Sequence, residues 1–119
     1  MSGELAFVEI GVDDVEKGRV FYEGLFGWKF ETGPSGGYVI SMPNVGGGIH
    51  GGDKESSPYL FYRVDDIDAA VTRVEELGGN VEDVDVEGDE ASIARFGRFK
   101  MCRDDQGSPF GLHQPPLPM

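Results

Sequence analysis

The 119-residue sequence contains little cysteine, few basic residues and no long apolar run. With Cys102 as its one cysteine, the chain can form no internal disulfide, and a reducing compartment is expected. No apolar stretch approaches the roughly 20 residues that a membrane-spanning helix requires. The first residues also lack the charged and apolar regions of a secretory signal peptide. The sequence therefore predicts a soluble, cytoplasmic protein with no membrane partner.

Basic residues are outnumbered, with 10 Lys and Arg against 22 Asp and Glu and a formal net charge of −12. Such a chain is repelled by nucleic-acid phosphates, so nucleic acid is excluded as a partner. Many of the acidic residues lie between Glu75 and Glu90, and this run is interpreted as a solvated face. Cys102 shows no Cys-His pattern around it, which favours a buried strand thiol over a nucleophile.

Two segments of the chain resemble each other at an offset of 52 residues. Val12-Asp13-Asp14-Val15 begins the first and Val64-Asp65-Asp66-Ile67 begins the second. At the same offset, Gly27 corresponds to Gly79. A duplicated strand-helix unit is predicted, with modules at residues 4–53 and 58–115 inside one domain of residues 1–119.

In the first module, alternation predicts a strand over residues 6–12. Its inward set (Val8, Ile10, Val12) is expected to face a helix, and its other set (Phe7, Glu9, Gly11) the opposite side. Asp13 is predicted to cap that helix, which ends at Gly27. Strands are expected over residues 28–32 and 37–42. The glycine-rich residues 44–53 fit either a short strand or a flexible loop.

In the second module, a strand is predicted over residues 59–64, followed by a helix capped by Asp65 or Asp66. Further strands are expected over residues 80–86 and 98–103, with an acidic loop between them, and over residues 109–114. Each module thus has one strand, one helix and three strands in order. This order predicts an α+β fold with mixed, curved sheets rather than a doubly wound sheet.

Four motifs, in this order and spacing, resemble the vicinal oxygen chelate superfamily, which includes glyoxalase I, bleomycin-resistance proteins and extradiol dioxygenases. They are Phe7-Val8-Glu9-Ile10-Gly11-Val12-Asp13-Asp14, Phe21-Tyr22-Glu23-Gly24-Leu25-Phe26-Gly27-Trp28, Tyr62-Arg63-Val64-Asp65-Asp66-Ile67-Asp68-Ala69-Ala70 and Asp104-Asp105-Gln106-Gly107-Ser108-Pro109-Phe110-Gly111-Leu112. The resemblance implies two βαβββ modules whose sheets surround a cup-shaped cleft, and a homodimer. It also implies a divalent metal in the cup that chelates two neighbouring substrate oxygens.

The sequence departs from the family at the metal positions. The usual first-strand His corresponds to Phe7, the second-module His to Tyr59, and the usual Glu of the last strand to Gly111. Phenyl and glycine offer no ligand atom, and a neutral phenol is a poor ligand. The standard metal site is therefore predicted to be absent, with no cofactor expected in its place.

Strand parity assigns an aromatic set with a few polar groups to the concave side, a composition typical of small-molecule pockets. The set is Phe7, Glu9, Tyr59, Phe61, Arg63, Gly111 and His113. Glu9 is singled out because an acidic residue between Val8 and Ile10 is unexpected unless it faces a polar cavity. Its roles could be a catalytic base, a ligand acceptor or a displaced metal ligand. The alternatives are an ion pair with Arg63, or exposure at a sheet edge.

His50 and His113 are the only histidines. Together with Glu9 they could form a two-His-one-carboxylate metal set. Neither histidine occupies the usual family position, which favours ordinary surface or pocket histidines. Trp28 and Phe30 could form an aromatic wall for a flat ligand or belong to the core.

Three hypotheses follow. The leading one is a glyoxalase or bleomycin-resistance type protein that binds a small aromatic or cationic molecule, with Glu9 and Arg63 as polar anchors. The second is a divalent-metal-dependent lyase, isomerase or dioxygenase that uses Glu9, His50 and His113. The third is a partner-binding module whose cup is filled by its own side chains.

Overall fold

The computed structural model describes residues 3–33, 36–83 and 88–116. Its contacts divide the chain into two compact units, Phe7–Leu60 and Met1–Ala6 together with Phe61–Met119. Strands β1 (Leu5–Gly11) and β5 (Pro58–Arg63) each run from one unit into the other. None of the helices in the described residues combines the length and the apolar character needed to cross a membrane.

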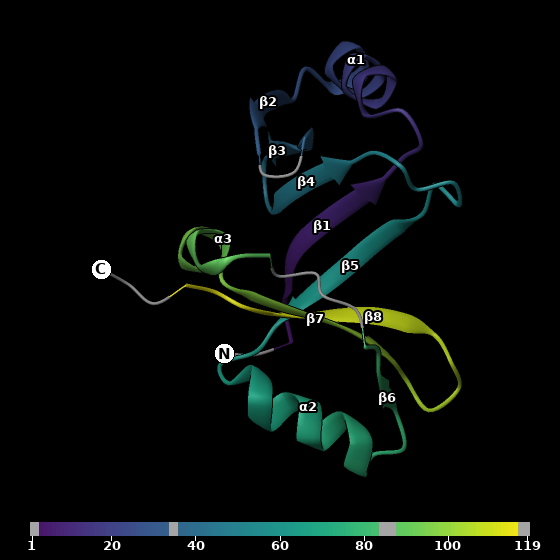
Figure 1. Cartoon of the computed structure of the whole chain (residues 1–119), viewed down its shortest axis with the longest axis vertical. Helices are drawn as coiled ribbons and strands as arrows, with labels where there is room; N and C mark the ends of the chain where they lie inside the picture. The colour runs from purple at the N-terminus through teal and green to yellow at the C-terminus, as the bar shows by residue number, and fades with distance from the viewer. Residues whose placement is uncertain (1–2, 34–35, 84–87, 117–119) are drawn as a thin grey trace. The chain divides into compact units, whose positions relative to one another are not determined.

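The unit Phe7–Leu60 is a sheet with one helix on it (Figure 1). Its other elements are α1 (Val15–Phe26), β2 (Lys29–Thr32), β3 (Tyr38–Ser41) and β4 (Gly46–His50). The strands follow the order β2-β3-β4-β1, with β1 parallel to β4 and the other pairs antiparallel. Residues 44–53, for which the sequence allowed either a strand or a loop, therefore contain a strand, β4.

Helix α1 is capped by Asp14 rather than by the predicted Asp13. Asp14 is the last extended residue, and its carboxylate accepts the backbone N–H groups of Glu16 and Lys17 at 3.1 Å each. Gly27 ends the helix in the left-handed conformation, with φ 70°, as predicted. The prediction of Asp13 was wrong by one residue because both positions are Asp and spacing alone does not separate them.

The core of this unit lies between α1 and the sheet. Ile40 and Ile49 are buried, and a Cβ placed on Gly18 of α1 would come within 2.9 Å of Ile49 Cδ1. The last turn of α1 does not join this core, because Leu25 and Phe26 are 59% and 56% exposed. The apolar residues of this helix therefore pack against the sheet at its start and are exposed at its end.

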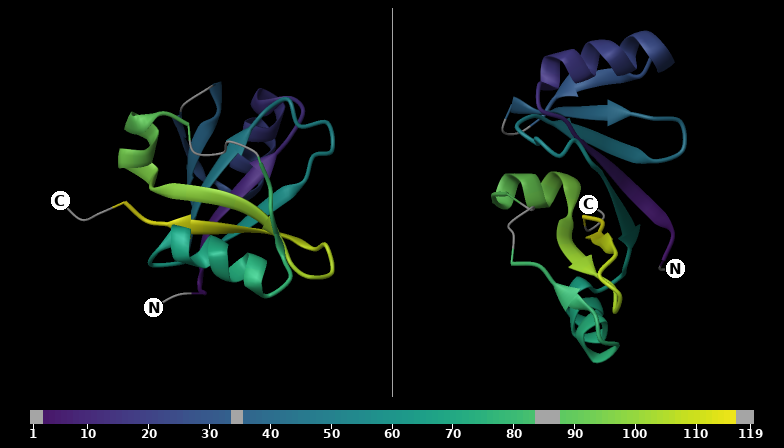
Figure 2. Two further views of the ribbon diagram at one scale, coloured as in Figure 1. Left: turned by 60° about the horizontal axis from the view of Figure 1, so that its bottom comes forward. Right: turned by 90° about the vertical axis from the view of Figure 1, so that its right-hand side faces the viewer.

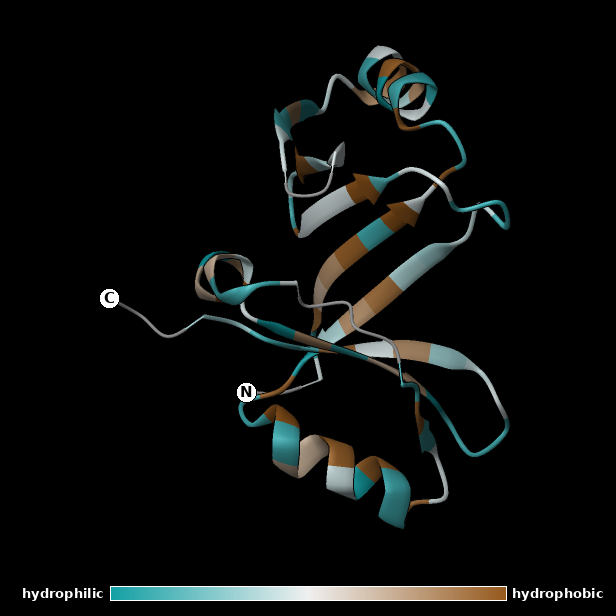
Figure 3. Ribbon diagram, in the orientation of Figure 1, coloured by the Kyte–Doolittle hydropathy of each residue, from teal (hydrophilic) through white to brown (hydrophobic). Residues whose placement is uncertain are grey.

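The second unit, described by itself, contains two helices on opposite sides of its sheet (Figure 2). Its elements after β5 are α2 (Ile67–Glu76), β6 (Asn80–Val81), α3 (Glu90–Phe96), β7 (Arg98–Arg103) and β8 (Pro109–Gln114). The strand order is β5-β8-β7-β6, and β5 is parallel to β8. Ile67, Cys102 and Leu112 form the core beneath α2. The apolar positions of α2 recur along one side of its ribbon in Figure 3.

Cys102 is fully buried in this core, as predicted. Desolvation by its apolar surroundings raises the pKa of the thiol. The side chain therefore remains a neutral thiol and packs as a small apolar group.

The acidic segment before β7 corrects the prediction of a loop, because it contains α3. Asp89 caps this helix by accepting the Ser92 N–H at 2.9 Å, and Gly97, at φ 92°, ends it. The preceding strand β6 covers only Asn80 and Val81 of the predicted residues 80–86, of which residues 84–86 lie outside the described residues. A short capped helix in an acidic run lacks the long apolar period that identifies a helix in sequence.

The fold class is α+β, as predicted.

Candidate functional site

The face of the β1–β4 pair that turns away from α1 carries the candidate site. In the parallel register, Glu9 lies beside Gly48 and Gly11 beside His50. Ile10 and Ile49 are partners on the other face, where Ile49 packs near Gly18 of α1. The predicted parity of β1, with Ile10 toward the helix and Glu9 away from it, is confirmed.

Glycine makes room for the polar side chains on this face. A Cβ on Gly48 would lie 2.6 Å from Glu9 Oε1 and 3.4 Å from Phe7 Cζ. Real Cβ atoms do not approach an oxygen so closely, so a side chain at this position would displace the carboxylate. In Figure 3, β4 is pale over most of its length, whereas β1 beside it is mainly brown. The glycine run therefore provides space for the carboxylate of Glu9.

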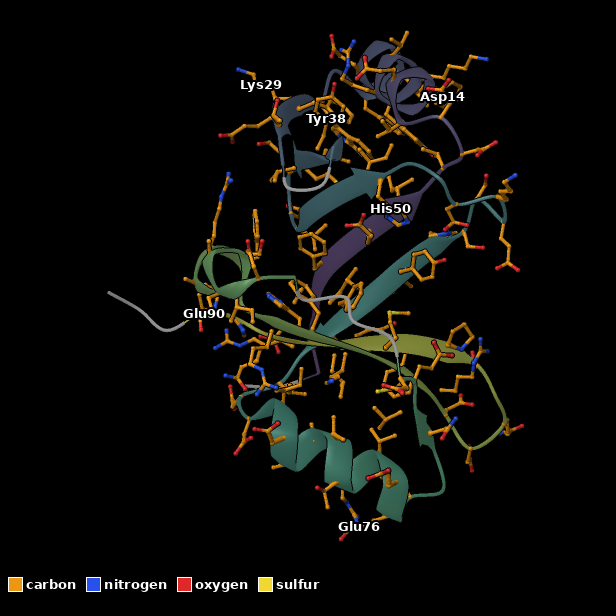
Figure 4. All side chains as sticks on the ribbon, in the orientation of Figure 1. Asp14, Lys29, Tyr38, His50, Glu76 and Glu90 are labelled. Atoms are coloured by element: carbon orange, nitrogen blue, oxygen red, sulfur yellow. The ribbon has the colours of Figure 1, made fainter. Side chains whose placement is uncertain are left out.

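Glu9 and His50 form the central contact of the site. His50 Nδ1 lies 2.5 Å from Glu9 Oε2, and His50 stands at the end of β4 (Figure 4). The Glu9 side chain is 25% exposed, and burial raises its pKa more than the hydrogen bond and charge of His50 lower it. Among the described residues, no second hydrogen bond reaches this carboxyl group. Glu9 Oε1 is thus an acceptor available to a ligand.

Asp53 extends this contact into a network that sequence reasoning missed. Its Oδ2 accepts the Tyr59 hydroxyl at 2.8 Å and lies 3.6 Å from His50 Nε2. Its Oδ1 accepts the backbone N–H groups of Glu55 and Ser56 at 3.0 and 3.1 Å. These bonds, that of Tyr59 above all, lower the pKa of Asp53. The available sequence signal was the Asp53-Lys54-Glu55-Ser56 pattern, which is typical of an Asx turn.

Four residues of the predicted concave set lie in the other unit, namely Phe61, Arg63, Gly111 and His113. Phe61 is 4% exposed, and its ring meets Phe99 edge to face at 5.2 Å. His113 stacks on Phe99 at 4.4 Å, and its Nε2 lies 2.7 Å from the Phe96 carbonyl oxygen. Burial lowers the pKa of His113. Arg63 lies 3.9 Å from Glu4 and 3.8 Å from Asp65.

The two aromatic residues considered as a wall both belong to the unit Phe7–Leu60. Trp28 stacks on Phe26 at 4.7 Å and on Tyr22 at 5.6 Å, beside α1. Phe30 meets Tyr38 edge to face at 6.0 Å. The Tyr38 hydroxyl in turn donates to Glu16 of α1. These rings thus connect α1 to the strands beneath it.

The residues at the family's metal positions do not fit a divalent ion. Phe7 has no ligand atom, and the Tyr59 hydroxyl is committed to Asp53. A Cβ at Gly111 would lie 2.2 Å from Phe61 Cδ2, so the aromatic ring occupies the space of a larger side chain. Within residues 3–33, 36–83 and 88–116, no group of three or more His, Cys, Asp or Glu side chains is arranged to hold a metal.

Comparison with known proteins identifies relatives. Residues 5–41 match the family model "Bleomycin resistance protein-like N-terminal". Over 120 residues, covering 91% of this chain, the sequence is 30% identical to CFP32 of Mycobacterium tuberculosis and of Mycobacterium bovis, whose name places it among the glyoxylases. The chain spans 44% of the length of these relatives.

Solved structures share the fold. The protein BH1468 of Bacillus halodurans C-125 superposes with a TM-score of 0.70 at 17% identity, covering 100% of this chain and 99% of that one. Methylmalonyl-CoA epimerase of Mycobacterium tuberculosis superposes with a TM-score of 0.66 at 21% identity, covering 97% and 89%. In this chain β1 to β4 follow the order βαβββ, whereas the second half has the additional helix α3 between β6 and β7. The family-model match and the sequence relatives indicate the vicinal oxygen chelate superfamily, the group of the glyoxalases and bleomycin-resistance proteins.

Proposed function

We propose that this chain binds a small aromatic or cationic molecule at the Glu9–His50 pair, without the standard metal site of its superfamily. The proposal rests on the environment of the Glu9 carboxyl group. The Glu9 side chain is three-quarters buried, on a sheet face where Gly48 leaves room for it. Its Oε2 contacts His50, whereas its Oε1 remains available. Oε1 is not one of the buried side-chain atoms without a hydrogen-bond partner among the described residues, so it is accessible from solvent. A ligand donor could therefore reach Oε1 and bind there.

The charges and rings around the pair favour a cationic or flat ligand. Glu9 and Asp53 are two carboxyl groups on either side of one imidazole. The ring of Phe7 approaches Gly48 on the same face, and the ring of Tyr59 lies 6.1 Å from that of His50. Aromatic faces attract cations, and a net charge of −12 speeds their approach.

A small-molecule ligand also suits the relatives. One structural neighbour is a methylmalonyl-CoA epimerase solved with methylmalonyl-CoA and ammonium, at 13% identity and a TM-score of 0.69. The proposal for this chain rests on Phe7, Glu9, His50 and Tyr59. Phe61 and His113 lie in the buried cluster of the other unit, and Trp28 packs beside α1.

Ethidium, a flat aromatic cation with its own fluorescence, tests the proposal, and fluorescein serves as a flat anion of similar size. We expect saturable binding of ethidium and none of fluorescein. Glu9→Gln and His50→Gln should each weaken ethidium binding about tenfold, the loss of roughly one charge-assisted contact. The matched control is Glu23→Gln, which removes a carboxylate that contacts Arg19 on the exposed face of α1. No saturable binding, or equal losses in the Glu9 and Glu23 variants, would overturn the proposal.

A second candidate function is a metal-dependent lyase, isomerase or dioxygenase that uses displaced ligands. The observation in its favour is that two of the three suggested ligands, Glu9 and His50, do lie together. Elemental analysis of tag-free protein and melting scans with nickel, zinc, manganese and iron test it. Bound metal, or a rise in Tm that His50→Gln abolishes, would favour this function over the first, and a metal that neither binds nor stabilises the chain would exclude it.

We also propose a homodimer in a reducing, cytoplasmic compartment. Val20, Phe21, Leu25 and Phe26 of α1 are each more than half exposed, and such apolar surface favours association. The buried, unpaired Cys102 suits a reducing environment. Light scattering coupled to size exclusion measures the mass directly, and a monomer at micromolar concentration would exclude the dimer.

A further inference from the structure

We propose that a second copy of this chain docks on the outer face of α1, which is formed by Val20, Phe21, Leu25 and Phe26. The inference rests on the homodimer proposed above, because it assigns the surface through which that dimer forms. Each of the four side chains is 56% to 61% exposed. A helix face that meets water is normally polar, so an apolar face of this kind indicates a surface that is covered.

Helix α2 shows which residues stand at the same positions when a helix faces water. The aspartates that cap the two helices are separated by the same 52 residues as the similar segments of the sequence. At this offset Val20 corresponds to Thr72, which is exposed. Phe21 corresponds to Arg73, which forms an exposed ion pair with Glu76 at 3.3 Å. The outer face of α2 is therefore suited to solvent, whereas that of α1 is suited to an apolar neighbour.

A group of stacked rings supports the outer face of α1. Phe26 stacks on Trp28 at 4.7 Å, and Trp28 stacks on Tyr22 at 5.6 Å. Phe21 meets Tyr22 edge to face at 5.1 Å. Because the rings hold one another in place, little side-chain freedom remains to be lost when a partner binds. Aromatic residues are also enriched at the centres of protein interfaces, so this face has the composition of an interface core.

Charged residues on the same helix pair with one another. Arg19 contacts Glu23 at 2.9 Å and Glu16 at 3.3 Å, so both carboxylates have a cation within the chain. The outer face of α1 therefore does not require a charged partner, and another apolar surface matches it best. The same face of a second copy is such a surface.

The distribution of charge along the chain favours a second copy over a basic partner. Acidic residues outnumber basic ones 22 to 10 in the whole chain. Residues 15–30, by contrast, contain three basic side chains (Lys17, Arg19, Lys29) and two acidic ones (Glu16, Glu23). A basic partner would be attracted to the acidic remainder of the chain rather than to this segment. Two copies repel each other through that remainder, so they approach most easily where the acidic excess is absent.

Light scattering over a dilution series of the full chain tests the proposed surface. The double variant Val20→Thr, Phe21→Arg gives α1 the residues that α2 has at these positions. We expect a dimer in the unmodified chain and a dissociation constant raised about 30-fold or more in the variant, because a central aromatic contact is lost. Leu77→Arg is the matched control, since Leu77 at the end of α2 is as exposed as Phe21, at 61%. It should leave the dissociation constant unchanged.

The fluorescence of Trp28, the only tryptophan, gives a second measurement that needs no variant. Because Trp28 stacks on Phe26, a copy docked over Phe26 should shield it from solvent. Acrylamide should therefore quench Trp28 more strongly as the unmodified chain is diluted. In the double variant, quenching should be strong at every concentration, and circular dichroism confirms that this variant is folded.

The outcomes separate this surface from the dimer itself. A dimer that persists in the double variant, or quenching of Trp28 that does not change while the unmodified chain dissociates, would overturn the assignment to α1 and leave the proposed dimer standing. An unmodified chain that is monomeric at every concentration would overturn both. Ethidium binding does not enter this experiment, so its failure would leave the proposed surface standing.

Discussion

The two units contain the same pairing of residues between parallel strands, but with a polar result in one unit and an apolar result in the other. In each, a glycine on a later strand lies beside a large side chain of a parallel first strand: Gly48 beside Glu9, and Gly111 beside Phe61. A Cβ at either glycine would collide with that side chain, at 2.6 Å and 2.2 Å. The glycine creates the space, and the residue opposite decides whether it becomes apolar core or polar site.

The surroundings of the two positions reinforce the difference. Phe61 joins Phe99 and His113 in a buried cluster, where the carbonyl at the end of α3 meets His113. Glu9 instead meets His50, with Asp53 behind it. The comparison teaches that the same pairing of a glycine with a large side chain on a parallel strand can provide space for either an apolar ring or a polar carboxylate.

The sharpest test removes the ring that fills the space in the second unit. Phe61→Ala should lower the free energy of unfolding by about 3–5 kcal/mol, because Phe61 is 4% exposed and the cavity cannot collapse onto Gly111. Phe7→Ala, on the half-buried strand face beside Glu9, should cost only about 1 kcal/mol. Urea denaturation gives both values. Equal costs would mean that the two faces are packed alike.

The next test fills the space in the first unit. Gly48→Ala should lower stability by about 1–3 kcal/mol and displace the Glu9 carboxylate from His50, because the added Cβ meets Oε1. Gly24→Ala is the control, since its Cβ meets nothing within 4 Å on α1, and should raise stability by about 0.5–1 kcal/mol. If Gly48→Ala proves as harmless as the control, the glycine run does not serve Glu9.

Sequence alone predicted the parity of β1 and most elements, because strand alternation and helical period leave direct marks on residue order. It predicted that Glu9 faces away from α1, but left its partner open between Arg63 and a set with His50 and His113. The structure places His50 beside Glu9 through the register of β4, a glycine strand without measurable alternation. Asp53 was missed for a related reason, since its role depends on a loop returning over Gly11.

A smaller expected effect is the pH dependence of stability, which differs between the two units. Burial raises the pKa of Glu9 above its ordinary value of 4.5, so its ionised form is disfavoured in the folded chain. Stability from the neutral form is present below that value and is lost as pH rises through the folded pKa. Glu9→Gln should therefore gain Tm relative to the unmodified chain as pH increases from 4 toward 6. A Tm difference that stays constant or shrinks over this range would contradict the assignment.

The smallest effect has the opposite sign and belongs to the other unit. Burial lowers the pKa of His113 below its ordinary value of 6.5, so the unfolded chain binds a proton more readily. The stability due to neutral His113 is present above 6.5 and is lost as pH falls toward the folded pKa. His113→Gln, whose amide can still donate to the Phe96 carbonyl, should flatten the decline of Tm just below pH 6.5. Glu9 and His113 thus impose opposite slopes on stability, and the double variant should show both changes independently. If the slope of Tm against pH is unchanged in His113→Gln, another group titrates in this range. The buried cluster and the polar face would then not differ in this respect.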